Sequence, residues 1–272
     1  FAMCALLVGN TATTLSEFAG IASALELFSV SKYIAVPVAG IAVWFLIMGG
    51  SSHNRVQRFF LVLSCVFVTY IVAAFMCNAD WGDVMAHTVI PTVENDSGFI
   101  SIVIAAIGTT IAPWMLFFTQ NNVVEEGTGT DEMFYKRVDI VTGSVVACLI
   151  AWFIIVTTGT VLFPAGIQIE DAADAANALA PIAGVHAREL FSIGLLGASL
   201  LAACVLPLTT SNAICEAFGW EQGVDRTWAE APAFKGLFTG IIVVSCAVVL
   251  IPDINLMGVM LTAQFINGIL LP

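Results

Sequence analysis

The sequence predicts an all-α integral membrane protein. Hydrophobic residues make up 59% of the 272-residue chain and charged residues only 10%, and the mean hydropathy of +0.98 lies well outside the range of ordinary soluble domains. Apolar runs of about 20 residues, the length needed to cross the hydrocarbon core of a bilayer, recur from end to end. Each run is expected to be a helix, because only helices and closed barrels satisfy the backbone in lipid and these runs are too long and too uniformly apolar for barrel strands.

About eight such runs can be drawn, and they leave no room for a soluble domain. We therefore treat residues 1–272 as a single transmembrane domain. The chain opens at Phe1 without a methionine and stops at Pro272, in both cases inside apolar sequence, so we expect it to be a fragment of a longer protein. The predicted spans are residues 2–28, 33–50, 57–77, 98–123, 138–163, 186–217, 234–251 and 254–272.

The distribution of Lys and Arg predicts which side of the membrane each loop faces, since cytoplasmic loops carry an excess of both. With residue 1 in the cytoplasm, six of the eight Lys and Arg residues fall on the cytoplasmic side. The loop at 78–97 is then external, and it carries acids but no Lys or Arg. We expect an integral protein of a bacterial plasma membrane, in contact with the lipid bilayer. The predicted cytoplasmic residues are Arg55, Arg58, Lys136, Arg137, Arg226 and Lys235, and the external ones are Lys32 and Arg188.

The sequence contains no pattern typical of an enzyme. Its seven cysteines are scattered singly, without a CxxC pair or a His/Cys cluster at metal-finger spacing, and are predicted to be small buried hydrophobes. No P-loop, GxSxG or nucleophile–base pair is present. The net charge of −12 can enrich cations near the surface, although acidic loops are also simply solvated. We expect no enzymatic activity, no cofactor, no nucleic-acid partner and no obligate protein partner.

The fourth run contains the segment GTTIAPWMLFFTQ at 108–120, in which Gly108 and Pro113 disturb a continuous helix. Proline lacks an N–H and clashes with the carbonyl four residues earlier, so the carbonyls near Gly108 and Thr109 lose their partners. Two interpretations stay open. The run is either a plain proline kink, or a helix broken near 108–113 whose free carbonyls and negative dipole end face a cation, as in the midplane sites of transporters.

The first span has a polar face. Asn10, Thr13, Thr14 and Glu17 follow one another at i, i+3, i+4 and i+7, which places all of them on one side of a helix. A carboxylate inside a membrane span is costly. Glu17 is therefore expected to point into the bundle or a wet cavity, either as a functional residue or as a structural one tied to a neighbouring helix.

Two later spans also carry polar groups. The segment LTAQFINGILLP at 261–272 places Gln264 and Asn267 three residues apart on one face, where amides either join helices or offer oxygens to a ligand. The pattern alone slightly favours a role in joining helices over a role as ligands. The segment LPLTTSNAICEAFGW at 206–220 places Pro207 and the polar residues 209–212 in the sixth span, as a polar break that lines a pathway or merely satisfies a kinked backbone.

Two of these segments, TTLSEFAGIASALELF at 13–28 and GTTIAPWMLFFTQ at 108–120, resemble the Nramp family of divalent-metal transporters. The order and lengths of the spans agree with that family along the whole chain. The resemblance implies a LeuT-like inverted-repeat bundle of about eleven spans, of which this chain matches about the third to the tenth, with residue 1 on the cytoplasmic side. The first-span Asp and Asn that hold metal in the family are absent from this chain, so the fragment by itself is not expected to transport.

The chain departs from the family pattern at the broken helix. Proton-coupled members carry Ala-Thr-Val-Met-Pro-His there. Aligned on Pro113, this chain has Thr109 for the alanine whose carbonyl binds metal, Ala112 for the methionine and Trp114 for the histidine. A thioether is a soft ligand that favours transition metals over Mg²⁺. Its replacement by a methyl group leaves a roomier, oxygen-lined site that suits a partly hydrated ion, since Mg²⁺ keeps several of its waters.

The proton route of the family is altered as well. Glu17 matches the glutamate of the family's Asp-x-x-Glu, but Thr14 stands at the aspartate and Leu7 at a further glutamate position. Trp114 cannot carry a proton as the family's histidine does. These substitutions resemble the Nramp-related magnesium transporter branch, whose members are uncoupled from protons. Gln264 aligns with a glutamine of the tenth span that lines the family's site, which favours the ligand role over joining helices.

The resemblance therefore implies a secondary transporter that takes up partly hydrated Mg²⁺, and also Mn²⁺, by proton-uncoupled alternating access. Two alternatives are a proton-coupled Mn²⁺/Fe²⁺ importer and a non-transporting membrane sensor with a transporter fold. The expected metal-site residues are Gly108 and Thr109 through their carbonyls, Ala112 through the space it leaves, and Gln264 through its amide oxygen. The residues expected to line the pathway are Thr14, Glu17, Trp114 and Asn267.

Overall fold

The computed structural model describes residues 2–49, 62, 65–90, 92–93, 95–112, 114–125, 129, 132–167, 169–180 and 184–270. Within these ranges the regular elements are α-helices and short 3₁₀ helices, and none is a β-strand. The predicted start of the third span at 57–61 lies outside the described residues, as do Arg55, Arg58 and the proline of the predicted break, Pro113.

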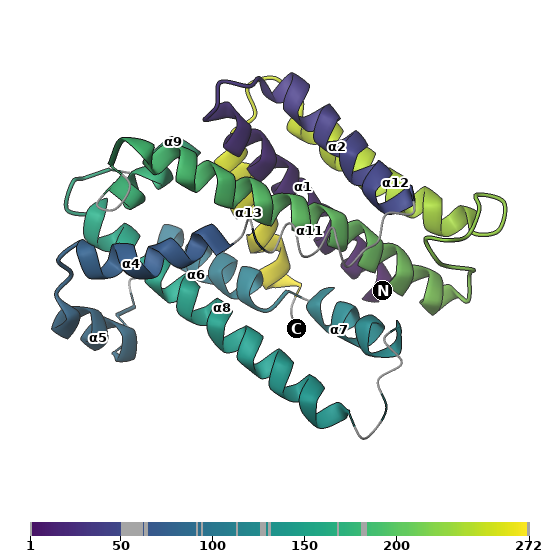
Figure 1. The fold of residues 1–272 in the computed structure, drawn as a ribbon, viewed down its shortest axis with the longest axis horizontal. Helices are drawn as coiled ribbons and strands as arrows, with labels where there is room; N and C mark the ends of the chain where they lie inside the picture. Colours follow the sequence, from purple (N-terminus) through teal and green to yellow (C-terminus); the bar gives the residue numbers. More distant parts are fainter. Residues whose placement is uncertain are drawn as a thin grey trace.

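The helix α1 (Ala2–Glu26) lies at the centre of a helical bundle (Figure 1). It contacts the helix that follows it and the three last helices of the chain, so the two ends of the sequence are folded together. These neighbours are α2 (Lys32–Met48), α11 (Ala187–Phe218), α12 (Pro232–Val249) and α13 (Leu256–Ile269).

Small residues allow the helices of this bundle to approach closely. An ideal Cβ built on Gly20 of α1 would lie 2.5 Å from Ser199 Oγ of α11, and one built on Gly40 of α2 would lie 2.9 Å from Cys246 Sγ of α12. Phe18 is fully buried beside Gly40. Close backbone approach at small residues is typical of helix pairs in membranes, where packing rather than water exclusion holds helices together.

Four stretches within the described ranges are long and apolar enough to cross a membrane. A bent helical pair adds a fifth when it is counted as one span, and α2 and α13 are apolar but shorter. With 25 residues, α1 is long enough to cross but stays outside this set, because its polar face lowers its hydropathy. The four stretches are Ser97–Gln120, Met133–Val161, Gly184–Phe218 and Pro232–Val249, and the bent pair is Cys65–Met76 with Trp81–Val89.

The segment 78–97, which the charge distribution predicts as an external loop, contains a helix, α5 (Trp81–Val89). Asp80 caps it, because its carboxylate accepts hydrogen bonds from the N–H groups of Gly82 and Asp83. An aspartate directly before the first helical residue is a strong helix-start signal. The preceding helix and α5 are bent by 118° relative to each other, so the chain turns back instead of leaving the bundle as an extended loop.

The long helix α8 (Met133–Val161) lies along one edge of the molecule (Figure 1). It packs against α4 (Thr69–Met76) and exposes apolar side chains such as Val141, Val145 and Leu149 along its length. A helix that is apolar on its exposed side is expected where lipid replaces water. This exposure therefore agrees with a membrane-crossing position.

The helix α11 is continuous through Pro207, so the polar residues that follow this proline do not break it. The hydroxyls of Thr209, Thr210 and Ser211 each donate to the carbonyl one turn earlier, at 2.9, 2.7 and 2.7 Å. Serine and threonine can satisfy themselves in this way inside a helix. The helix instead ends at Gly219, whose φ of +67° is the left-handed conformation that glycine adopts most easily.

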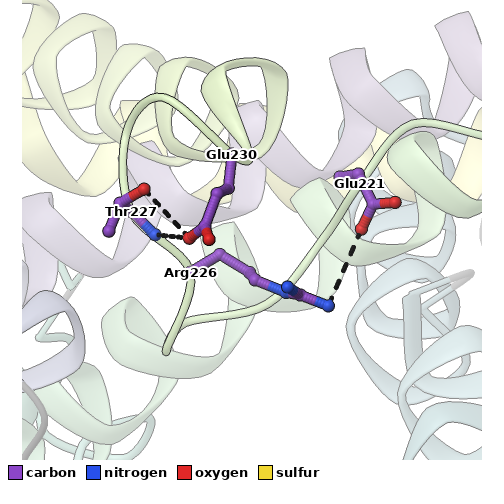
Figure 2. Close-up of polar contacts among 4 residues, drawn as sticks. All are labelled: Glu221, Arg226, Thr227 and Glu230. Atoms are coloured by element: carbon purple, nitrogen blue, oxygen red, sulfur yellow. Dashed lines mark hydrogen bonds and ion pairs between the residues drawn. The ribbon is translucent and has the colours of Figure 1, made fainter.

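The loop between α11 and α12 is held by polar contacts at the surface (Figure 2). The Glu230 carboxylate accepts hydrogen bonds from the N–H of Thr227, at 2.7 Å, and from its hydroxyl, at 2.9 Å. These bonds, together with the charge of Arg226, hold the pKa of Glu230 below its ordinary value. Arg226 also pairs with Glu221 at 4.0 Å, an exposed contact of a kind that contributes little to stability.

Candidate functional site

The fourth predicted span consists of two helices in the structure (Figure 1). The helix α6 (Ser97–Thr110) ends where Ile111 adopts φ −125° and ψ 65°, and α7 (Trp114–Glu125) follows. The carbonyl of Thr109 has no main-chain donor four residues further on, because that residue is Pro113. The last turn of α6 therefore presents carbonyl oxygens and the negative end of the helix dipole at the break.

The backbones of α6 and α13 touch at Gly108. A Cβ on Gly108 would overlap the carbonyl oxygen of Gln264 and the main-chain nitrogen of Gly268, and a Cβ on Gly268 would overlap the carbonyl oxygen of Ile104. Any larger residue at Gly108 or Gly268 would push the two helices apart. These glycines therefore set the distance between the broken helix and α13.

A group of amides and hydroxyls joins α13 to α1. Asn267 Nδ2 donates to Thr13 Oγ1 at 2.7 Å and to Gln264 Oε1 at 3.3 Å. Gln264 Nε2 donates to Ser16 Oγ at 3.4 Å. The Gln264 side chain, whose own main chain contacts Gly108, is therefore held between α13 and α1.

A second polar contact joins α1 to α11. Asn10 Nδ2 donates to Thr210 Oγ1 at 2.7 Å, and both side chains are buried. Glu17 is half-buried, and its carboxylate faces Ser199 of α11. Thr14 is fully buried, and its hydroxyl donates to the carbonyl of Asn10 at 2.8 Å. The single polar face predicted for the first span is thus shared between two neighbouring helices.

The residues expected at the metal are only partly brought together. Gly108 and Gln264 are in main-chain contact, and Ala112 is buried in the break at 3% exposure. The side chain of Thr109 is exposed, so this residue can contribute to the site through its carbonyl. Sequence reasoning missed Gly268, although a glycine directly after the polar face of the last span is a signal for a close helix crossing.

The residues expected along the pathway are divided between two interfaces. Asn267 contacts Gln264 directly, whereas Glu17 contacts α11 and Thr14 bonds to its own helix. Trp114 opens α7, and its side chain lies outside the described part of the structure. Ser16, the partner of Gln264, was missed in the sequence. It stands three residues after Thr13, on the side of α1 that faces α13.

The chemistry available near the break is that of oxygen. Among the described residues, no group of three or more His, Cys, Asp or Glu side chains could hold a metal ion. The groups that do lie there are main-chain carbonyls, amides and hydroxyls. Such neutral oxygens are ligands of hard cations, whereas soft and intermediate metals favour sulfur and imidazole.

A profile of the Nramp family, described as "Natural resistance-associated macrophage protein-like", matches residues 1–272. The chain belongs to the Nramp family. Membership confirms the predicted fold class, an all-helical membrane bundle of the LeuT type, and identifies this Nramp chain as an integral membrane protein.

Three curated bacterial proteins, each named "Divalent metal cation transporter MntH", are similar to this Nramp chain. The protein of Caldanaerobacter subterraneus subsp. tengcongensis is 24% identical over 203 residues, which are 71% of this chain and 48% of that protein. The protein of Clostridium acetobutylicum is 23% identical over 146 residues, 52% of this chain and 34% of its own length. The protein of Verminephrobacter eiseniae is 22% identical over 207 residues, 73% and 47% respectively. The matched segments thus span half or less of the length of these relatives.

Proposed function

We propose that this Nramp protein takes up divalent metal ions by alternating access without proton coupling, with partly hydrated Mg²⁺ as its main substrate and Mn²⁺ as a second one. The observation that carries the proposal is the break between α6 and α7. There the Thr109 carbonyl has no N–H four residues further on, because that residue is Pro113, and a buried Ala112 stands where a thioether would favour soft metals. The shared name of the three relatives supports the metal class.

The proposed donor set consists of neutral oxygens. The carbonyls of Gly108 and Thr109 lie in the last turn of α6, and Gly108 itself packs against the main chain of Gln264. The Oε1 atom of Gln264 accepts one hydrogen bond from Asn267, and its second lone pair is available to a ligand. Because Mg²⁺ binds oxygen and gives up its waters reluctantly, an ion at this site would make some of its contacts through water.

The membrane potential is sufficient to drive such uptake. A cytosol-negative potential of 100 mV supplies about 4.6 kcal/mol for a doubly charged ion, at about 2.3 kcal/mol per charge. Leu7, Thr14 and Trp114, which replace acidic residues and a histidine of proton-coupled relatives, have no proton to exchange near neutral pH. These substitutions support transport without proton coupling.

A proton-coupled Mn²⁺/Fe²⁺ importer is the second candidate, and Glu17 is the observation that favours it. It is a half-buried carboxylate in the middle of α1, and it faces Ser199 of α11. Carboxylates at such positions in membrane bundles often take part in proton transfer. The two candidates therefore differ in whether Glu17 exchanges a proton during transport.

The test is uptake of Mg²⁺ and of Mn²⁺ by the full-length protein in proteoliposomes that contain a pH-sensitive dye. We expect Mg²⁺ to enter without acidification. We also expect Ala112→Met to raise the preference for Mn²⁺ over Mg²⁺ by about ten-fold, which corresponds to about 1.4 kcal/mol. Ala247→Met is the matched control, because it adds the same thioether to an exposed position of α12.

Three results would contradict the proposal. Entry of Mn²⁺ with acidification, and no entry of Mg²⁺, would favour the proton-coupled importer. An equal change of preference in Ala112→Met and Ala247→Met would remove the break from the ion site. Uptake of neither ion by a folded full-length protein would favour the non-transporting sensor.

A further inference from the structure

Four side chains form a polar cluster between α1 and α13: Thr13 and Ser16 from α1, and Gln264 and Asn267 from α13. Asn267 is fully buried, and Thr13 is nearly so. The N–H groups of Asn267 reach both Thr13 Oγ1, at 2.7 Å, and Gln264 Oε1, at 3.3 Å. Gln264 in turn donates from Nε2 to Ser16 Oγ, at 3.4 Å. The two amides are thus joined head to tail, with a hydroxyl at each end.

The direction of these bonds is set by the hydroxyls. Thr13 Oγ1 donates its proton to the carbonyl of Gly9 at 2.9 Å, and Ser16 Oγ donates to the carbonyl of Thr13 at 2.7 Å. A hydroxyl has a single proton, so both oxygens can only accept bonds from the amides. Asn267 must therefore turn Nδ2 towards Thr13, and Gln264 must turn Nε2 towards Ser16.

This arrangement leaves one buried acceptor unused. Asn267 Oδ1 has no hydrogen-bond partner among the residues that the structure describes, and it lies against Gly9, where a Cβ would come within 3.1 Å of it. A buried polar atom without a partner is costly. A leucine of similar shape would fill the same space without that cost, so packing alone does not explain an asparagine at position 267.

We infer that Asn267 is a positioning residue for Gln264, the amide ligand of the proposed metal site. With Nε2 bound to Ser16 and Oε1 bound to the N–H of Asn267, the Gln264 amide cannot rotate by half a turn. A rotated amide would set its own N–H groups against those of Asn267. The metal is therefore offered an oxygen and never an N–H group.

The inference rests on the proposed function, because it assumes that Gln264 contacts the ion. It adds the expectation that Asn267 acts on metal affinity and not on the conformational cycle. Loss of Asn267 should then raise KM and leave kcat unchanged, and it should have no effect when the Gln264 amide is already absent.

The experiment is a double-mutant cycle on Mg²⁺ and Mn²⁺ uptake by the full-length protein in proteoliposomes. We expect Asn267→Leu to raise KM about five-fold, the change that follows from one net hydrogen bond, with kcat unchanged. In a Gln264→Ala background the same substitution is expected to change KM no further. Thr262→Val is the matched control, because Thr262 lies on an exposed face of α13 and its hydroxyl donates to the carbonyl of Gly258 in the same helix.

An equal rise of KM with and without the Gln264 amide would overturn the inference, as would a wild-type KM for Asn267→Leu. If Asn267→Leu does not fold, Ser16→Ala gives the same test from the Nε2 side, and its effect must also vanish in the Gln264→Ala background. If Asn267→Leu leaves KM unchanged while Gln264→Ala raises KM, this inference alone is refuted. An unchanged KM in Gln264→Ala refutes the metal site and this inference together.

Discussion

Replacing Gly108 by alanine tests whether the contact between α6 and α13 sets the geometry of the break. The added methyl group would overlap main-chain atoms of Gln264 and Gly268 and would lie 2.9 Å from Gly268 Cα, whereas ordinary contacts begin at 3.4 Å. Main-chain atoms cannot move aside as a flexible side chain can, so the helices must separate. Overpacking typically costs about 1–3 kcal/mol, and the better helix propensity of alanine offsets up to about 1 kcal/mol. We expect a net loss of about 1–2 kcal/mol.

The assay is thermal unfolding of the full-length protein in detergent, followed by metal uptake. A loss of this size lowers Tm by about 2–8 °C, at about 2–4 °C for each kcal/mol. Gly240→Ala in α12 is the control, because a Cβ there meets no atom of the described residues within 4 Å, and its Tm is expected to stay the same or rise. If Gly108→Ala is as stable as Gly240→Ala and transports like the wild type, the backbone contact does not set the geometry.

Two further predictions concern the surface loop and the contact between α1 and α11. The pKa of Glu230 is lowered in the folded state, so its hydrogen bonds to Thr227 are fully formed above the ordinary value of 4.5 and are lost as the pH falls through the folded-state pKa. Hydrogen exchange at the Thr227 amide is therefore expected to lose its protection on acidification. Glu230→Gln is expected to lack that protection already at neutral pH, and the control Glu221→Gln is expected to behave like the wild type. Asn10→Leu is expected to lower the free energy of unfolding by about 1 kcal/mol, because its buried hydrogen bond to Thr210 is lost. In chemical denaturation, adding Thr210→Val to Asn10→Leu should lower that free energy little further. Fully additive losses would show that the two side chains do not act as a pair.

The break in the fourth span was predictable because it follows from a local property of the chain. Pro113 has no N–H wherever it stands, so the Thr109 carbonyl lacks its helical donor in any fold. The prediction began the break at Gly108, but α6 continues to Thr110. Gly108 instead allows the close contact with α13. Such a contact joins segments far apart in the chain, so it could not be predicted from the local sequence pattern.

The partners of the polar residues could not be predicted for the same reason. The spacing of Gln264 and Asn267 places them on one helical face, but it does not say which helix they meet. Their partners Thr13 and Ser16 lie at the other end of the chain. The sequence pattern predicted a break after Pro207, because it does not show that the hydroxyls of the following residues bond to carbonyls of their own helix.

Five hydroxyls of α1 and α11, those of Thr13, Thr14, Ser16, Thr209 and Thr210, share a hydrogen-bonding pattern that has a consequence for protons. Each donates its only proton to a carbonyl of its own helix. A proton can hop along a row of hydroxyls only if each one swings to release a proton on one side while it receives another on the opposite side. At these five positions every swing would first break the bond to the carbonyl, so these hydroxyls do not pass a proton on to one another unless water enters.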